Sequence, residues 1–155
     1  MKYRTINIEK DKDIIIKFRK DSYVVSFGFE ERFGDENAYI NRIKERVNKF
    51  PNGQVIIEID DLPIGQMELQ IRDFEGKKIG YVNLFYLIPE YRGKGLGKEL
   101  ISYAEDFFNK SNVSEYHLWV SPTNVRAMRL YTNAGMIKFR EENEKYLMYR
   151  MMKLL

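Results

Sequence analysis

The first half of the chain contains apolar residues at both strand and helix spacing. Residues 3–8 alternate enough to predict a first strand. Apolar positions at helical spacing predict one helix capped by Asp11 or Asp13, and a second helix that begins at Asp35. Between them, residues 23–29 are apolar and aromatic, and their pattern does not distinguish a strand from a loop.

The pattern in the middle of the chain predicts strands followed by a strand–helix–strand unit. Residues 54–60, 63–71 and 78–88 predict three antiparallel strands, and the last is apolar on both faces, as at a sheet centre. Residues 96–108 repeat apolar positions at helical spacing, and residues 116–120 predict a buried strand.

The C-terminal segment adds one helix and two strands. A short helix begins at Val125 and ends at Gly135, and residues 136–141 and 145–154 predict strands around a tight turn at 142–144. No linker or repeat divides the chain, so we expect a single domain over residues 1–155. The element order predicts an α+β fold of the three-layer type.

Composition and charge exclude several classes of protein. The chain has 155 residues, 44% of them hydrophobic, which is enough for a real core. It has no Cys and a single His, His117, which we expect to be packed; this argues against a Cys- or His-rich metal site, and we expect no metal. A net charge of +3 with mixed signs argues against nucleic acid as a partner. With no membrane-length apolar run and no signal-peptide core in the sequence, we expect a cytoplasmic protein with no membrane partner.

The segment 87–97, LIPEYRGKGLG, has the composition of an anion-binding loop. It joins a predicted strand to a predicted helix, whose first N–H groups and partial positive charge favour an anion. Three glycines and three basic residues surround this turn: Gly93, Gly95, Gly97, Arg92, Lys94 and Lys98. Neither a Walker A loop nor a dinucleotide-binding fingerprint fits this spacing.

Two motifs resemble one known family. Arg92, Gly95 and Gly97 match Arg/Gln-x-x-Gly-x-Gly/Ala, the acyl-CoA pyrophosphate loop of the GNAT N-acetyltransferase superfamily. A later segment resembles the family's Asn-x-x-Ala-x-x-Leu-Tyr-x-x-x-Gly-Phe, in the residues Asn124, Ala127, Leu130, Tyr131, Gly135 and Met136. The resemblance covers essentially the whole chain. It implies the GNAT acyl-CoA N-acyltransferase fold, a mixed, mostly antiparallel sheet of about seven strands flanked by about four helices.

The resemblance also implies an activity and a site. It implies an acetyl-CoA-dependent N-acetyltransferase that acts on a primary amine of an unidentified small molecule or peptide, by direct attack on the thioester. Tyr131 matches the family's general acid. The positions that match the family's coenzyme-binding residues are Leu87, Arg92, Gly93, Lys94, Gly95, Leu96, Gly97, Lys98 and Asn124.

The general base is where the sequence departs from familiar relatives, because Tyr81 replaces their glutamate. Asn83 is the candidate catalytic residue on the same strand: it could relay a proton through water or bind the acceptor, or be a polar residue satisfied by its neighbours. Glu68 is a further candidate, and a dedicated base could be absent. The aromatic residues between 23 and 33 could line an acceptor pocket. Their acidic neighbours would favour a cationic acceptor or form a solvated loop: Glu30, Glu31 and Asp35.

Two questions stay open at the level of sequence. A non-catalytic acyl-CoA-binding module on the same fold is the alternative to an enzyme, and the missing glutamate at Tyr81 is its support. Relatives often dimerise through C-terminal strands, and residues 145–155 suggest either an exposed edge for a homodimer or a strand of the chain's own sheet.

Overall fold

The computed structural model describes residues 1–143 and 145–155. Its helices and strands are β1 (Lys2–Thr5), α1 (Ile8–Phe27), α2 (Glu36–Lys49), β2 (Gln54–Ile59), β3 (Leu62–Phe74), β4 (Lys77–Leu87), α3 (Leu96–Lys110), β5 (Glu115–Val120), α4 (Val125–Asn133), β6 (Ile137–Asn143) and β7 (Leu147–Leu154). Short 3-10 turns lie at Glu31–Phe33, Pro51–Gly53 and Pro89–Tyr91. Within the described residues, every helix is too short or too polar to span a membrane.

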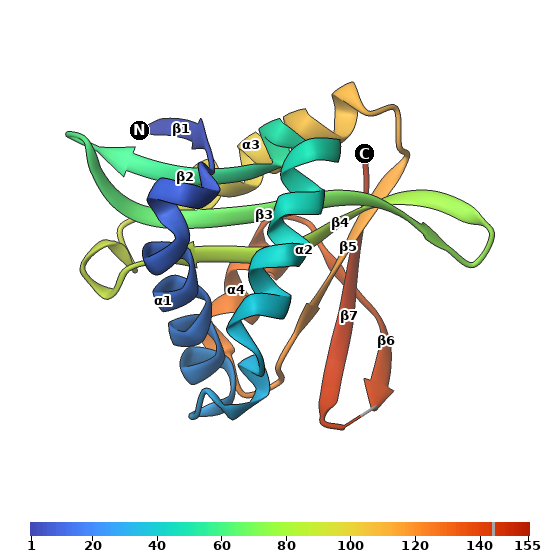
Figure 1. Cartoon of the computed structure of the whole chain (residues 1–155). Helices are drawn as coiled ribbons and strands as arrows, with labels where there is room; N and C mark the ends of the chain where they lie inside the picture. Colours follow the sequence, from blue (N-terminus) through green and yellow to red (C-terminus); the bar gives the residue numbers. More distant parts are fainter. Residues whose placement is uncertain (144) are drawn as a thin grey trace.

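One seven-stranded sheet forms the middle layer, in the order β1-β2-β3-β4-β5-β7-β6. Helices α1 and α2 cover one face, and α3 and α4 cover the other (Figure 1). Consecutive residues of β2 pack against the helices on opposite faces of the sheet. Ile56 packs with Ile15 and Ile43 on the first face, and Ile57 packs with Leu100 on the second. The predicted three-layer α+β arrangement is confirmed.

The centre of the sheet is where regular pairing stops. Strands β4 and β5 are the one parallel pair among the described strands, and they are in register only from Gly80–Tyr116 to Val82–Leu118. Both strands continue beyond that point without pairing with each other, so they splay apart. On the other side of β4 the register with β3 shifts, which leaves Asn83 without a partner in β3, as in a β-bulge.

The first helix differs from its prediction at both ends. It begins at Ile8, because the Asn7 side chain accepts a hydrogen bond from Lys10 N at 3.1 Å and caps it. Asp11 is not the cap; it pairs with Arg4 at 2.7 Å. The helix then continues to Phe27 and stops at Gly28, whose φ of 84° suits glycine. The segment without a clear pattern is therefore mostly helix.

The C-terminal hairpin turns later than predicted. Glu142 and Asn143 belong to β6, because they pair with Met148 and Leu147 of β7. Of the predicted turn, Glu144 lies outside the described residues. Strand β7 pairs with β5 on one side and β6 on the other, so residues 147–154 complete the chain's own sheet, and β6 is the edge.

Candidate functional site

A cavity of about 530 Å³ opens where β4 and β5 separate. At one end it is lined from β5, α4 and the turn between them, by Val120, Ser121, Asn124, Ala127 and Tyr131. At the other end it is lined from α1, β3, β4 and β7, and this end includes Arg19, Tyr23, Arg72, Tyr81 and Arg150. The cavity therefore passes from the α4 side of the sheet to the α1 side, through the gap between the strands.

The loop that follows β4 depends on its glycines. Gly93 and Gly95 have φ of 73° and 82°, a left-handed conformation that costs other residues about 1–2 kcal/mol. Gly97 serves packing: a Cβ there would lie 2.8 Å from Leu130 of α4, so its absence lets α3 and α4 approach closely. The loop's shape therefore follows directly from its sequence.

The start of α3 is open to an anion. Asn7, Asp35 and Asn124 cap α1, α2 and α4 with their side chains, whereas α3 begins at Gly95 with no side-chain cap. Within the described residues its first N–H groups are thus without a capping acceptor, and a Cβ at Gly95 would meet only open space. These free donors, together with the helix dipole, fit a pyrophosphate.

Arg92 anchors the loop as well as charging it. Its Nε donates to Leu87 O at 2.7 Å, and another N–H donates to Asp21 of α1 at 2.9 Å. The guanidinium also lies over the ring of Tyr86. Arg92 thus connects the loop to the end of β4 and to α1, a role that the motif alone did not indicate.

Leu87 offers one main-chain donor to the gap. Ile88 N donates to Ile64 O of β3 at 2.8 Å, so by strand alternation the Leu87 N–H points the other way, towards the separated β5. The Leu87 carbonyl is occupied by Arg92. A ligand between the strands would therefore meet the N–H of Leu87 and not its carbonyl oxygen.

Tyr131 lies on α4 with its ring 6.2 Å from that of Phe85 on β4, measured between centroids. It is 9% exposed and lines the cavity. Burial raises its pKa above the usual value, so the phenol keeps its proton throughout the physiological range. Its hydroxyl has no hydrogen-bond partner in the part of the chain that the structure describes. The result is a buried proton donor that faces the gap.

Asn124 combines a structural contact with a place in the cavity. Its Oδ1 accepts a hydrogen bond from Ala127 N at 3.2 Å and caps α4. The side-chain amide nitrogen is not needed for that cap, and Asn124 lines the cavity. A donor at the mouth of the gap is what the motif implied for this position.

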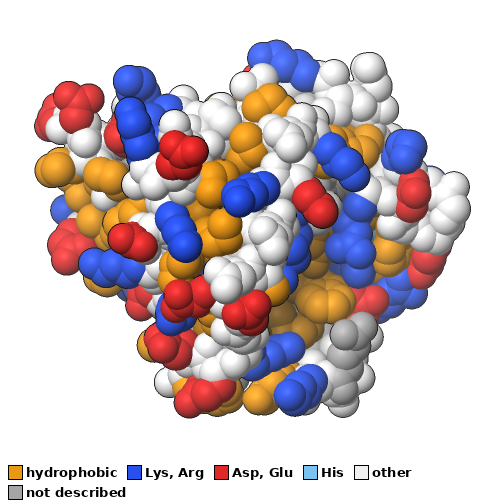
Figure 2. All heavy atoms as spheres, viewed as in Figure 1, with side chains coloured by type: hydrophobic (Ala, Val, Ile, Leu, Met, Phe, Trp, Pro, Cys, Tyr) orange, Lys and Arg blue, Asp and Glu red, His pale blue; other side chains and the backbone are white. Residues whose placement is uncertain are grey.

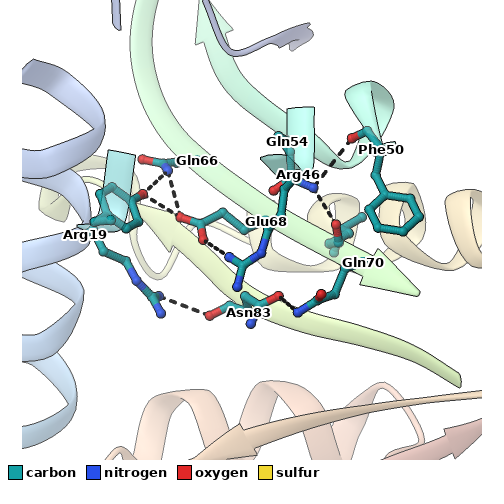
Figure 3. Close-up of polar contacts among 10 residues, drawn as sticks. Arg19, Arg46, Phe50, Gln54, Gln66, Glu68, Gln70 and Asn83 are labelled. Atoms are coloured by element: carbon teal, nitrogen blue, oxygen red, sulfur yellow. Dashed lines mark hydrogen bonds and ion pairs between the residues drawn. The ribbon is translucent and has the colours of Figure 1, made fainter. Parts of the chain in front are cut away.

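The base candidates on β3 and β4 have different surroundings (Figure 3). Asn83 accepts a hydrogen bond at Oδ1 from Gln70 at 2.7 Å, and its carbonyl accepts one from Arg19 at 3.0 Å. Glu68 is fully buried; it accepts from the Tyr39 hydroxyl at 2.6 Å and pairs with Arg46 at 3.1 Å. Because Glu68 does not line the cavity, these contacts favour a structural role for its carboxylate.

Tyr81, which replaces the family glutamate, is not a base. It lines the cavity, and burial raises its pKa, so its phenol is neutral. The guanidinium of Arg72 lies 4.9 Å from its ring centre, and that of Arg150 lies at 5.8 Å. The position that carries an anion in many relatives is here an aromatic platform for two cations.

His117 is packed, as predicted, and it fixes one of these cations. It is fully buried on β5, its Nε2 lies 2.5 Å from a Glu115 oxygen, and its Nδ1 lies 3.1 Å from an Arg150 nitrogen. Because guanidinium can only donate, Nδ1 is the acceptor and Nε2 carries the proton. Burial lowers the pKa of His117, so the ring is neutral at physiological pH.

The interpretation of an acidic acceptor pocket is wrong for this cavity. Tyr23 and Phe27 do line it, but Glu30, Glu31 and Asp35 do not, and Asp35 caps α2 instead. The charged groups that sequence reasoning missed are arginines. They come from segments far apart in the chain, and no local motif connects them: Arg19, Arg32, Arg72 and Arg150.

Among the residues that the structure describes, no three His, Cys, Asp or Glu side chains gather as a metal site would require. The chemistry visible in the cavity is that of N–H donors, phenols, guanidinium groups and the carboxylate of Glu142.

Comparisons with known proteins agree with this geometry. The model of the acetyltransferase (GNAT) family matches residues 16–136. An uncharacterized N-acetyltransferase of Archaeoglobus fulgidus is 30% identical over 128 residues, covering 79% of this chain and 86% of that protein.

Solved structures share the fold at low sequence identity. The ribosomal-protein-alanine N-acetyltransferase of Brucella melitensis matches with a TM-score of 0.80 at 16% identity, over 100% of both chains. The PaiA N-acetyltransferase of Thermoplasma acidophilum, in complex with coenzyme A, matches with a TM-score of 0.77 at 22% identity, over 99% of this chain and 98% of that one. The GNAT fold expected from the two motifs is confirmed, and the chain belongs to the GNAT acetyltransferase family.

Proposed function

We propose that the chain, as one domain over residues 1–155, transfers an acetyl group from acetyl-CoA to a primary amine. The observation that carries this proposal is the cavity through the splayed strands, with a buried neutral Tyr131 on its wall and an uncapped helix start beside it. Membership of the family and the coenzyme A complex of the Thermoplasma acidophilum neighbour support the choice of co-substrate.

In this proposal the loop and the gap bind different parts of acetyl-CoA. The N–H groups from Arg92 to Lys98, with the charges of Lys94 and Lys98, bind the pyrophosphate. The N–H of Leu87 and the side chain of Asn124 bind the pantetheine arm from its two sides. When bound, the thioester supplies an acyl carbon activated towards nucleophiles.

The acyl transfer then needs two contributions from the protein. A backbone N–H of β4 near Leu87 polarises the thioester carbonyl, as in an oxyanion hole. The amine nitrogen bonds to the acyl carbon, and the carbon–sulfur bond breaks. Tyr131 donates its phenolic proton to the departing thiolate, and the phenol is restored from solvent.

The amine must lose a proton before or during attack, and among residues 1–143 and 145–155 no carboxylate is free to take it at the gap. Glu142 is the one acidic residue that lines the cavity within the described chain. Although burial opposes the shift, the hydrogen bond from Arg150 lowers the pKa of Glu142, which makes this carboxylate a weak base. We propose that solvent takes the proton, with Asn83 positioning water or the acceptor.

A calorimetric titration with acetyl-CoA tests the proposal, with ATP and NAD as controls. Selective binding of acetyl-CoA, followed by thiol release with members of an amine panel, is the expected result. Binding without release to any amine would favour the non-catalytic module, and absence of binding would contradict the coenzyme site.

A further inference from the structure

The end of the cavity on the α1 side is strongly cationic. Within the described part of the chain, four arginines line it and one glutamate opposes them: Arg19, Arg32, Arg72, Arg150 and Glu142. Figure 2 shows Lys and Arg side chains around the hollow between α2 and the β6–β7 hairpin. The end that faces α4 has no charged lining residue between Val120 and Tyr131 within the described chain. The positive charge therefore lies where an acceptor would enter, and the arm of the coenzyme would meet neutral groups.

The charges of these arginines are only partly neutralised. Arg150 already has protein partners, because it pairs with Glu142 at 2.7 Å and donates a hydrogen bond to His117. Arg19 uses one N–H on the carbonyl of Asn83. Over residues 1–143 and 145–155, no carboxylate lies within 4.0 Å of Arg19 or Arg72. These two side chains line the cavity, and some of their N–H groups remain free to donate to a ligand.

Aromatic rings, and not carboxylates, hold these guanidinium groups in place. Arg72 lies over Tyr81 at 4.9 Å, and Arg19 lies over Tyr23 at 5.1 Å, both measured to the ring centres. A cation–π contact uses the flat face of the guanidinium and leaves its edge, where the N–H groups are, free to donate. This arrangement is suited to a planar or tetrahedral oxyanion.

We propose that the acceptor is a primary amine that also carries an oxyanion, a carboxylate or a phosphate, which the edges of Arg19 and Arg72 bind. This inference rests on the proposed acetyltransferase function and specifies its substrate class. The anion anchors the acceptor on the α1 side, and the amine then reaches the gap at Asn83. A polyamine, which brings only positive charge, would be repelled by the same residues.

Matched pairs of amines test the proposal. Tyrosine and tyramine differ by one carboxylate, and phosphoethanolamine and ethanolamine differ by one phosphate, so the pairs also distinguish the two oxyanions. We expect the anionic member of at least one pair to have a kcat/KM at least tenfold higher, mainly through a lower KM. Spermidine should be a poor acceptor. If tyramine, ethanolamine and spermidine had kcat/KM values equal to or higher than those of the anionic amines, the proposal would be overturned.

Arg72→Glu is the informative variant, and Arg42→Glu is its control. Arg72 is exposed and makes no hydrogen bond to the main chain among the described residues. Arg42 on α2 is likewise exposed and lies over an aromatic ring, Tyr39, at 5.8 Å, but it does not line the cavity. We expect Arg72→Glu to raise KM for the anionic acceptor at least tenfold without changing kcat or acetyl-CoA affinity. Arg42→Glu should change KM less than twofold, and equal effects of the two would contradict the proposal.

A direct binding measurement tests this inference independently of turnover. N-acetyltyrosine and N-acetyltyramine can be titrated calorimetrically into the protein, with and without coenzyme A. Tighter binding of N-acetyltyrosine that Arg72→Glu removes would support the anion site even in a preparation without transferase activity. Binding of acetyl-CoA together with a preference for N-acetyltyramine would leave the proposed function intact and overturn this inference alone.

Discussion

The two ends of the cavity are built on different principles. At the α4 end, where we propose that the coenzyme binds, the cavity lies beside one continuous segment, residues 92–98, in which glycines in a left-handed conformation lead into an uncapped helix. The acceptor end is assembled from α1, β3, β4 and β7, and its character comes from side-chain charge. In our proposal the first end binds acetyl-CoA through backbone N–H groups, and the second end selects the acceptor through the charge of its side chains. A common co-substrate and a variable acceptor fit this division.

The largest effect should come from Tyr131, on the α4 side of the cavity. Tyr131→Phe keeps the buried ring and removes only the hydroxyl, so the thiolate would leave without a proton donor. We expect kcat to fall by about 10²–10³-fold. Acetyl-CoA affinity, measured by calorimetry, should stay within about twofold because the ring contacts of the pocket remain.

Tyr23→Phe is the matched control for Tyr131→Phe, since Tyr23 lines the same cavity at the acceptor end. Its kcat should stay near that of the unmodified protein. Unchanged turnover in Tyr131→Phe would show that the thiolate leaves without help from this residue, and the general acid would have to be sought elsewhere.

The coenzyme end should be sensitive to backbone conformation. Gly95→Ala meets no steric clash, since a Cβ there would have no heavy atom within 4 Å, but φ of 82° is unfavourable for alanine. Because the short loop can relax when empty, the cost of about 1–2 kcal/mol falls on binding, and acetyl-CoA affinity should drop about tenfold. Acceptor preference should be unaffected.

Gly76→Ala separates this effect from general destabilisation. Gly76 lies in the turn between β3 and β4, with φ of 84° and open space around a Cβ, so the backbone cost is the same. Its acetyl-CoA affinity should not change, because the backbone cost at Gly76 lowers the thermal stability of the protein and does not fall on binding. An equal affinity in the two variants would contradict the role of the Gly95 loop in binding the coenzyme.

The same division explains what the sequence could predict. Gly93, Gly95 and Arg92 form a contiguous motif, so their chemistry can be interpreted without a fold. Arg19, Arg72 and Arg150 come together only through sheet order and a bulge at Asn83, and neither leaves a local signal. Most elements could be predicted because their apolar spacing is regular. The end of α1 could not, because residues 23–27 pack against rings from other segments, such as Phe33 and Tyr146, and have no clear period of their own.

The stability of the protein should depend on pH through His117, which contacts Arg150 at the acceptor end. His117 has a folded-state pKa below its ordinary value of 6.5, so below about pH 6.5 the unfolded chain binds a proton that the folded protein does not. Stability is therefore lost as the pH falls through the pKa of the unfolded imidazole. Chemical denaturation between about pH 7 and 5.5 measures the loss.

His117→Gln tests the cause of that pH dependence. Glutamine can accept from Arg150 and donate towards Glu115, as the neutral imidazole does, but it cannot be protonated. Its stability should be nearly constant between pH 7 and 5.5. A slope as steep as that of the unmodified protein would contradict the role of His117. The carboxylates of Glu115 and Glu142, whose pKa values are lowered from 4.5, lose their stabilising contribution only at pH values below this range.

The smallest effect should come from Asn83, at the point where the two ends meet. Asn83→Ala removes the side chain that accepts from Gln70, while the backbone carbonyl that receives Arg19 stays in place. If Asn83 only positions water or the acceptor, kcat/KM for the amine should fall about two- to fivefold. Gln70→Ala, which removes the partner of Asn83, should then give a similar loss. A fall of about a hundredfold in Asn83→Ala alone would instead indicate that Asn83 holds the water that takes the proton of the amine, and would move the catalytic step towards the acceptor end.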